Sequence, residues 1–174
     1  PTRRPSAPRA PQFSNKTLKA GQTSVAESHY LHLAPSCQAY DAPAEVSRRI
    51  RAAAADSGIG LTLLPALYSH AGFGGQAPNE GQRRFINTTG HYLELQSPLA
   101  PLMAAQPAQC LGLCFPSLRA VTPGQIADLL AASHPHCPAH HHLAPPHNDV
   151  HHCAARTGPR PLPSLYYHVQ VAPL

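Results

Sequence analysis

GLTLLPALYSHAGFGGQAPNEGQRRFIN, residues 60–87, joins a short apolar run to a glycine-rich loop and then to the opening of a helix. The apolar run from Leu61 to Leu67, interrupted by Pro65, has the length of a strand buried on both faces of a parallel sheet. The loop from Tyr68 to Gly75 follows the carboxyl end of that strand. Its three glycines let the backbone bend and approach a ligand closely. This order of elements predicts a strand-helix fold with a site on the loop.

The same alternation of strand and helix continues in both directions along the chain. The expected strands are residues 23–31, 61–67, 111–115 and 139–144. The expected helices are residues 41–58, residues 79–96, a helix opened by the capping box at 122–125, and two weaker segments at 148–156 and 162–169. Asp41 is expected to cap the first helix and Gly58 to end it. The pattern indicates parallel strands with crossover helices, and it fits both an open sheet and part of a barrel.

The first residues differ in composition from the rest of the chain. Only 12% of all residues are charged, yet the formal net charge is +5, and five of the basic residues lie at the start: Arg3, Arg4, Arg9, Lys16 and Lys19. PTRRPSAPRAP has no apolar periodicity, so residues 1–17 are predicted to be a disordered basic tail and residues 18–174 the folded region. Nucleic acid is not an expected partner, because no interleaving of aromatic and basic residues follows.

The cysteines and the hydropathy pattern bear on the compartment. Five cysteines are an odd number without a secretory spacing, so reduced thiols in the cytoplasm are expected. No run approaches the roughly 18 apolar residues of a membrane span, and no charged-then-apolar leader is present. The chain begins at Pro1 instead of methionine, which indicates a piece of a longer protein.

Three runs of the sequence carry a resemblance to a known family: TSVAESHYLH (23–32), YSHAGFGGQAPNEGQRRFIN (68–87) and LGLCFPSLRAVTPGQIADLLAA (111–132). They closely resemble formimidoylglutamate deiminase, a zinc enzyme of the amidohydrolase superfamily, and the resemblance covers residues 18–171 with almost no gaps. It implies an α/β fold, a partial (β/α)8 TIM-type barrel of four consecutive βα units, because a complete barrel takes about 250 residues. Such a fragment exposes two strand edges, so self-association is expected.

The resemblance implies a hydrolase that acts on the C–N bond of a linear amidine. In the family a zinc-activated water converts N-formimidoyl-L-glutamate, a small-molecule substrate, to N-formyl-L-glutamate and ammonia in histidine degradation. His142 matches one zinc-ligating histidine, while the family's His-x-His pair and its aspartate have no counterpart in these residues. Pro145 occupies the position of the catalytic glutamate. Because proline cannot carry a proton, the fragment is expected to be inactive, with a loss of about two to four powers of ten from this change alone.

The resemblance also implies substrate-binding residues. Tyr30 matches a tyrosine that contacts the substrate, and Arg119 matches an arginine suited to hold a glutamate carboxylate in a fork. Pro116 replaces a histidine that donates to the substrate. His70, in the glycine-rich loop, is a further candidate for the pocket. Taken without the resemblance, Tyr30 fits a core aromatic, Arg119 a surface cation and His70 a loop residue bonded to backbone.

A histidine-rich tract supports an alternative. Eight of the 13 histidines lie between His134 and His152, with Cys137 and Cys153 near the two ends of the tract. Imidazole and thiolate bind zinc, copper or nickel even in disordered segments, so the alternative function is a non-enzymatic histidine-rich metal-binding protein. The spacing is not that of a zinc finger, and prolines interrupt the tract. Drift of the fifth-strand segment of the family is the other explanation.

Overall fold

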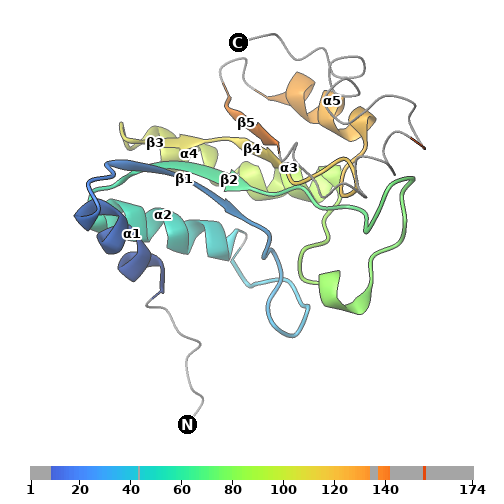
Figure 1. Cartoon of the computed structure of the whole chain (residues 1–174), viewed down its shortest axis with the longest axis horizontal. Helices are drawn as coiled ribbons and strands as arrows, with labels where there is room; N and C mark the ends of the chain where they lie inside the picture. The colour runs from blue at the N-terminus through green and yellow to red at the C-terminus, as the bar shows by residue number, and fades with distance from the viewer. Residues whose placement is uncertain (1–8, 43, 134–136, 142–154, 156–174) are drawn as a thin grey trace.

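The structure is a computed structural model that describes residues 9–42, 44–133, 137–141 and 155 (Figure 1). Its strands are β1 (Ser24–His29), β2 (Gly60–Pro65), β3 (Gln109–Leu111), β4 (Leu113–Phe115) and β5 (Ala139–His141). Its helices are α1 (Arg9–Lys19), α2 (Glu45–Ser57), the 3₁₀ turn η1 (Glu80–Gln82), α3 (Thr89–Gln96), α4 (Ala100–Ala104) and α5 (Pro123–Ala132). The predicted alternation of strand and helix is confirmed in these residues.

All strand pairs are parallel, and their order follows the chain. β1 pairs with β2, β2 with β3, and β4 with β5. A parallel bridge between Ala66 and Cys114, and a 2.9 Å bond from the Leu67 amide to the Cys114 carbonyl, join β2 to β4 as well. The expected third strand is therefore one extended run, divided at Gly112 into β3 and β4. Sequential order of parallel strands is the topology of a barrel segment, which confirms the predicted partial α/β barrel.

Gly112 lies at a point where three strands approach one another closely. Its amide donates to the carbonyl of Leu63 at 2.9 Å, and the next amide, of Leu113, donates to the carbonyl of Pro138 at 2.8 Å. A Cβ atom on Gly112 would stand 2.6 Å from both the Leu64 side chain and the Pro138 carbonyl oxygen. Only glycine fits this position, because the Pro138 contact is to backbone.

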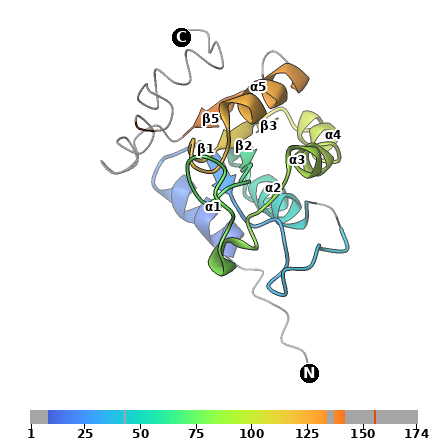
Figure 2. The same cartoon turned by 90° about the vertical axis from the view of Figure 1, so that its right-hand side faces the viewer.

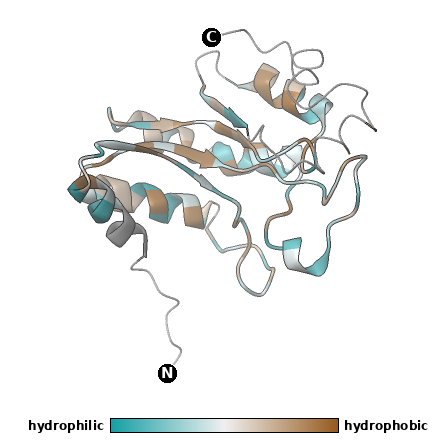
Figure 3. Ribbon diagram, viewed as in Figure 1, coloured by the Kyte–Doolittle hydropathy of each residue, from teal (hydrophilic) through white to brown (hydrophobic). Residues whose placement is uncertain are grey.

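The strands bury both of their faces. Leu61 and Leu63 of β2 pack toward α2 and α4, in a cluster that also contains Ala54 and Met103. Leu64 alternates to the opposite face, where Ala66, Cys114 and the partly buried Tyr30 surround it. Figure 2 shows α2, α3, α4 and α5 around one side of the strands, as on the outside of a barrel. Hydrophobic residues run along β2 to β4 and over α5 (Figure 3), so β2 is the buried centre of the fold.

The predicted disordered tail is wrong in its extent. Residues from Arg9 onward form α1, which packs on α2. Ser14 and Thr17 are buried, and Leu18 packs on the α2 cluster, so the inward face has helical spacing but small polar residues. That face carries no apolar periodicity, which is why the sequence pattern missed it. Residues 1–8 lie outside the described residues, so the tail stays a prediction there.

Two helix starts differ from the predictions. The expected helix 79–96 divides into η1 and α3, because the Thr88 hydroxyl accepts the His91 amide and begins a new helix at Thr89. The first helix begins at Glu45 instead of at Asp41, since Ala44 holds a left-handed φ of 57°. Its end at Gly58, with φ 76°, is as predicted.

Other predictions for the fold are confirmed or fall outside the described residues. The capping box at Thr122 and Gln125 begins α5 as predicted. Helix α4 was not predicted. Residues 142–144 of the fourth strand, and nearly all of the segments 148–156 and 162–169, lie outside the described residues.

We expect Gly112→Ala to destabilise the chain by about 1–3 kcal/mol, because the added methyl group overpacks the contact between three strands. Urea unfolding followed by circular dichroism measures this change. Gly124→Ala is the matched control, since its Cβ would meet nothing closer than 3.9 Å at the start of α5. Equal midpoints for the two variants would contradict the packing argument.

We also expect the 174-residue chain to self-associate. Within the described ranges, β1 pairs with β2 and β5 pairs with β4, so β1 and β5 are the end strands of the described sheet, where a strand of a second chain can pair. Light scattering on a sizing column should give a mass above that of one chain, rising with protein concentration. A single-chain mass at all concentrations would overturn this expectation.

Candidate functional site

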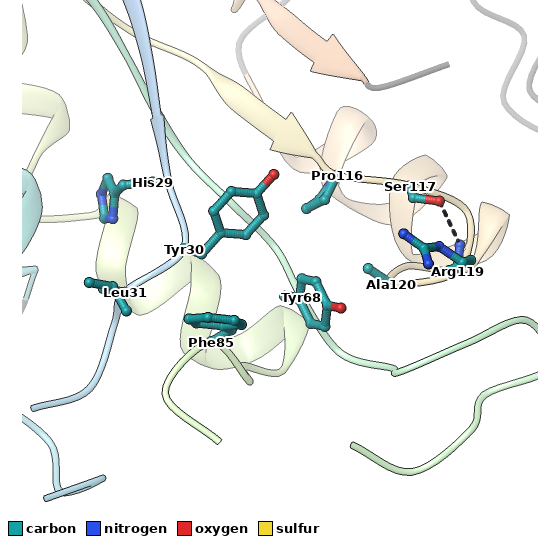
Figure 4. A pocket seen from close by; sticks show the side chains of 9 residues that line it. All are labelled: His29, Tyr30, Leu31, Tyr68, Phe85, Pro116, Ser117, Arg119 and Ala120. Carbon is teal, nitrogen blue, oxygen red and sulfur yellow. Dashed lines mark hydrogen bonds between the residues drawn. The ribbon is translucent and has the colours of Figure 1, made fainter. Parts of the chain in front are cut away.

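A cleft of about 630 Å³ opens at the carboxyl ends of the parallel strands. This is the end of a strand-helix barrel where loops carry active sites. The last residue of β1 and the segments that follow β1, β2 and β4 line it, together with one residue between η1 and α3. The lining residues, drawn in Figure 4, are His29, Tyr30, Leu31, Tyr68, Phe85, Pro116, Ser117, Arg119 and Ala120.

Three aromatic rings form one side of the cleft, and we call Tyr30, Tyr68 and Phe85 the aromatic wall. Their ring centroids lie 6.0 to 6.2 Å apart, at tilted or edge-to-face angles that favour attraction between rings. Burial, followed by the neighbouring Cys114 and Tyr68, raises the pKa of Tyr30. The Tyr30 hydroxyl is therefore a neutral hydrogen-bond donor at neutral pH.

The structure brings Tyr30 and Arg119, two of the predicted site residues, to the same cleft. Arg119 follows β4, is exposed, and has its backbone amide bonded to the Ser117 hydroxyl at 3.2 Å. Figure 4 shows its guanidinium beside Ser117 and Ala120, with the Tyr30 ring on the other side of Tyr68. Pro116 also lines the cleft, at the position where the resemblance expects a histidine. The cleft thus combines an exposed arginine with an apolar, aromatic side.

His70 is not among the residues that line this cleft. Its backbone amide donates to the carbonyl of Ala120 at 3.0 Å, and the neighbouring Ser69 amide donates to the same oxygen at 2.8 Å. These bonds tie the glycine-rich loop to the segment that carries Arg119. The role of His70 in substrate binding stays a prediction.

Sequence reasoning missed two buried histidines at the end of β1, although both lie in the quoted run TSVAESHYLH; His29 lines the cleft and His32 follows it. His29 has its Nε2 atom 2.7 Å from the Ser47 hydroxyl, and His32 donates from Nε2 to the Ala66 carbonyl at 2.7 Å. Burial, with the charge of His32 second, lowers the pKa of His29 to about 3. Burial also lowers the pKa of His32 to about 4, against the opposing effect of the Ala66 bond. Both rings are neutral at physiological pH and hold the strand ends in place.

The described residues do not by themselves form a metal site. Within residues 9–42, 44–133, 137–141 and 155, no group of three His, Cys, Asp or Glu side chains is placed to hold a metal ion. The predicted zinc ligand His142, and Pro145 in the glutamate position, lie outside these residues. We therefore derive no chemical step through a metal.

Among the helices in the described ranges, none has the length and apolar character needed to cross a membrane.

Comparisons with known proteins agree with this geometry. No protein-family model matches the chain. It is 56% identical over 161 residues to formimidoylglutamate deiminase of Pseudomonas aeruginosa, a match that covers 92% of this chain and 35% of that enzyme. The chain resembles part of a formimidoylglutamate deiminase. It spans about a third of the length of that relative. Because the match extends over nearly the whole sequence, the alternative of a histidine-rich metal-binding protein is not favoured.

Solved structures support the same fold. The chain superposes on an amidohydrolase from Brucella melitensis with a TM-score of 0.85 at 40% identity, covering 94% of this chain and 36% of that one. Its superposition on an atrazine chlorohydrolase from Arthrobacter aurescens, solved with zinc, has a TM-score of 0.69 at 18% identity and covers 91% and 34% of the two chains. The second likeness shows the fold alone. Both superpositions support the partial α/β barrel fold.

The buried histidine pair predicts how stability depends on pH. The folded pKa values of about 3 and about 4 lie below the ordinary value of 6.5, so only the unfolded chain takes up protons as pH falls from 6.5. The contribution of the two histidines to the free energy of unfolding is fully present above the ordinary pKa and is lost as the pH falls toward the folded pKa values. The slope of this loss approaches about 2.7 kcal/mol per pH unit, because two protons are taken up on unfolding. Urea unfolding between pH 7 and pH 4.5 measures the loss. His29→Gln should remove about half of the slope, and an unchanged slope would exclude this origin.

Proposed function

We propose that the cleft is part of the substrate site of an enzyme that converts N-formimidoyl-L-glutamate to N-formyl-L-glutamate and ammonia, in histidine degradation. These 174 residues then bind the substrate but do not complete its hydrolysis. The observation that carries the proposal is that Tyr30 and Arg119, far apart in the sequence, line one cleft at the carboxyl ends of the strands. The similarity to formimidoylglutamate deiminase of Pseudomonas aeruginosa supports the choice of substrate.

The cleft suits a ligand with carboxylates on a short aliphatic chain. The planar guanidinium of Arg119 can bind a carboxylate through two parallel hydrogen bonds. Tyr30 offers a neutral hydroxyl, because burial keeps its pKa above the ordinary value. The faces of Tyr68 and Phe85 supply apolar surface for the two methylene groups of the glutamyl chain. The three groups together favour a glutamate derivative over an uncharged amidine.

The chemical step needs groups that these residues lack. Pro145 stands in the glutamate position and Pro116 in the position of a donor histidine, so neither proton transfer nor that hydrogen bond is available there.

Zinc, with His142 as one ligand, remains the proposed cofactor. Metal analysis after dialysis against zinc, compared with a His142→Ala variant, tests it, and equal zinc contents in the two proteins would count against His142 as a ligand. The cytoplasm is the proposed compartment.

Arg119→Ala should weaken binding of N-formimidoyl-L-glutamate by about tenfold or more, since a hydrogen bond to a charged group contributes about 1.5–3 kcal/mol. Tyrosine emission can follow the titration directly, because the chain has six tyrosines and no tryptophan. Arg49→Ala is the matched control: Arg49 is exposed on α2 and pairs with Glu45, outside the cleft. Equal weakening by both substitutions would contradict a specific carboxylate contact.

We expect no ammonia release from N-formimidoyl-L-glutamate by the 174-residue chain with added zinc. A Pro145→Glu variant should also show none, because the remaining ligands of the family site are not present in these residues. A coupled ammonia assay measures both. Zinc-dependent turnover by the unchanged chain would show that association of chains or other groups complete the site.

A further inference from the structure

We propose that Asn87 is the positioning residue of the cleft: it clamps the aromatic wall in the spacing that selects a glutamyl over a shorter aspartyl chain. The selection of ligand rests on the proposed function. The clamp itself rests on geometry alone. Asn87 does not line the cleft, and it acts through Tyr68 and Phe85.

Asn87 is 3% exposed, and all of its polar groups are directed at the segment that follows β2. Its side-chain oxygen accepts the Tyr68 amide at 2.8 Å, and its side-chain nitrogen donates to the Ala66 carbonyl at 3.3 Å. Its backbone amide donates to the Tyr68 carbonyl at 2.9 Å, and its own carbonyl accepts the Ser69 hydroxyl at 2.9 Å. Four hydrogen bonds thus join one buried residue to three neighbours, and each polar group of Asn87 has a hydrogen-bond partner. We call this arrangement the clamp.

The clamp fixes two rings relative to each other. Asn87 is two residues from Phe85 and bonds to both backbone groups of Tyr68, so the two segments cannot separate without breaking these hydrogen bonds. The Tyr68 hydroxyl also accepts a bond from the Gln82 side chain at 2.9 Å, which attaches the same ring to η1. The centroids of Tyr68 and Phe85 lie 6.0 Å apart. The width of the aromatic wall therefore depends on Asn87.

Only an amide side chain can make both of the side-chain bonds. Aspartate has the same shape but no N–H donor, so Asn87→Asp would turn an oxygen toward the Ala66 carbonyl. That carbonyl would keep its bond from His32 at 2.7 Å. The substitution removes the bond to the Ala66 carbonyl and sets two oxygen acceptors against each other at the centre of the clamp, while leaving the volume unchanged. Asn15→Asp, at an exposed position on α1, is the matched control.

The first readout is the clamp itself. We expect hydrogen exchange at the amides of Tyr68 and Asn87 to accelerate about tenfold or more in Asn87→Asp, since a tenfold change corresponds to about 1.4 kcal/mol. Exchange in α5, and exchange throughout the Asn15→Asp control, should stay unchanged. Ser69→Ala removes one of the four bonds and should give a smaller acceleration at the same amides. The Ser69→Ala variant also tests the clamp if the Asn87→Asp variant does not fold. Unchanged exchange in the variants would overturn the clamp.

The second readout is specificity, which a merely structural residue would not alter. The unchanged chain should bind N-formyl-L-glutamate about tenfold more tightly than N-formyl-L-aspartate, because one methylene in an apolar site is worth about 1–3 kcal/mol. Asn87→Asp should reduce this ratio to within about threefold, and the Asn15→Asp control should preserve it. A ratio that survives in Asn87→Asp, with faster exchange, would overturn the positioning role. If the unchanged chain binds neither probe, the proposed function fails, while the exchange data still decide the clamp.

Discussion

Burial of β2 on both faces is the constraint on which the rest of the structure depends. Leu63 and Ala66, on opposite faces of this segment, are both 0% exposed. A strand buried in this way must have a parallel neighbour on each edge and helices over its outer face, because no backbone group can reach water. β1 and β3 provide the edges, and α2 and α4 cover the outer face. Gly112 lets the third strand approach closely enough to close the inner face.

The cleft follows from where these strands end. Parallel strands present their carboxyl ends at the same edge, so the residues after β1, β2 and β4 meet there. Hydrogen bonds then join the loops: His32 and Asn87 both donate to the Ala66 carbonyl in buried bonds, and Arg84 donates to the Leu33 carbonyl in part-buried ones. The Tyr92 hydroxyl donates to the Pro65 carbonyl from the helix side at 2.8 Å. The end of β2 is thus held by contacts from several segments, which gives the aromatic wall a fixed base.

A cleft that forms part of the proposed substrate site, without a complete catalytic centre, is consistent with the extent of the chain. It spans about a third of formimidoylglutamate deiminase and a similar share of the amidohydrolase from Brucella melitensis. A barrel active site draws residues from the ends of several strands, so four strands contain only part of it. Binding groups from neighbouring strands can meet within such a fragment. A metal centre whose ligands come from distant strands cannot be completed within such a fragment.

Local patterns in the sequence determined the order of strands and helices and the capped start of α5, because hydrophobic period and capping depend on neighbours along the chain. Joined to the family resemblance, they also predicted the partial barrel and proposed Tyr30 and Arg119 as substrate-binding residues. They failed at α1 and at the break before α3. At α1, a face with small polar residues packs on α2. Before α3, Thr88 and Asn87 make hydrogen bonds that the spacing of hydrophobic residues does not predict.

Only the tertiary structure decided that Tyr30 and Arg119 share one cleft and that His70 does not line it. It alone showed that His29 and His32 are neutral and buried and that Asn87 joins two loops. These properties arise from contacts between residues far apart in the sequence: His32 lies 34 positions from Ala66, and Asn87 lies 21 positions from it. The sequence by itself determines which side chains are present, and packing around β2 determines which of them lie next to one another.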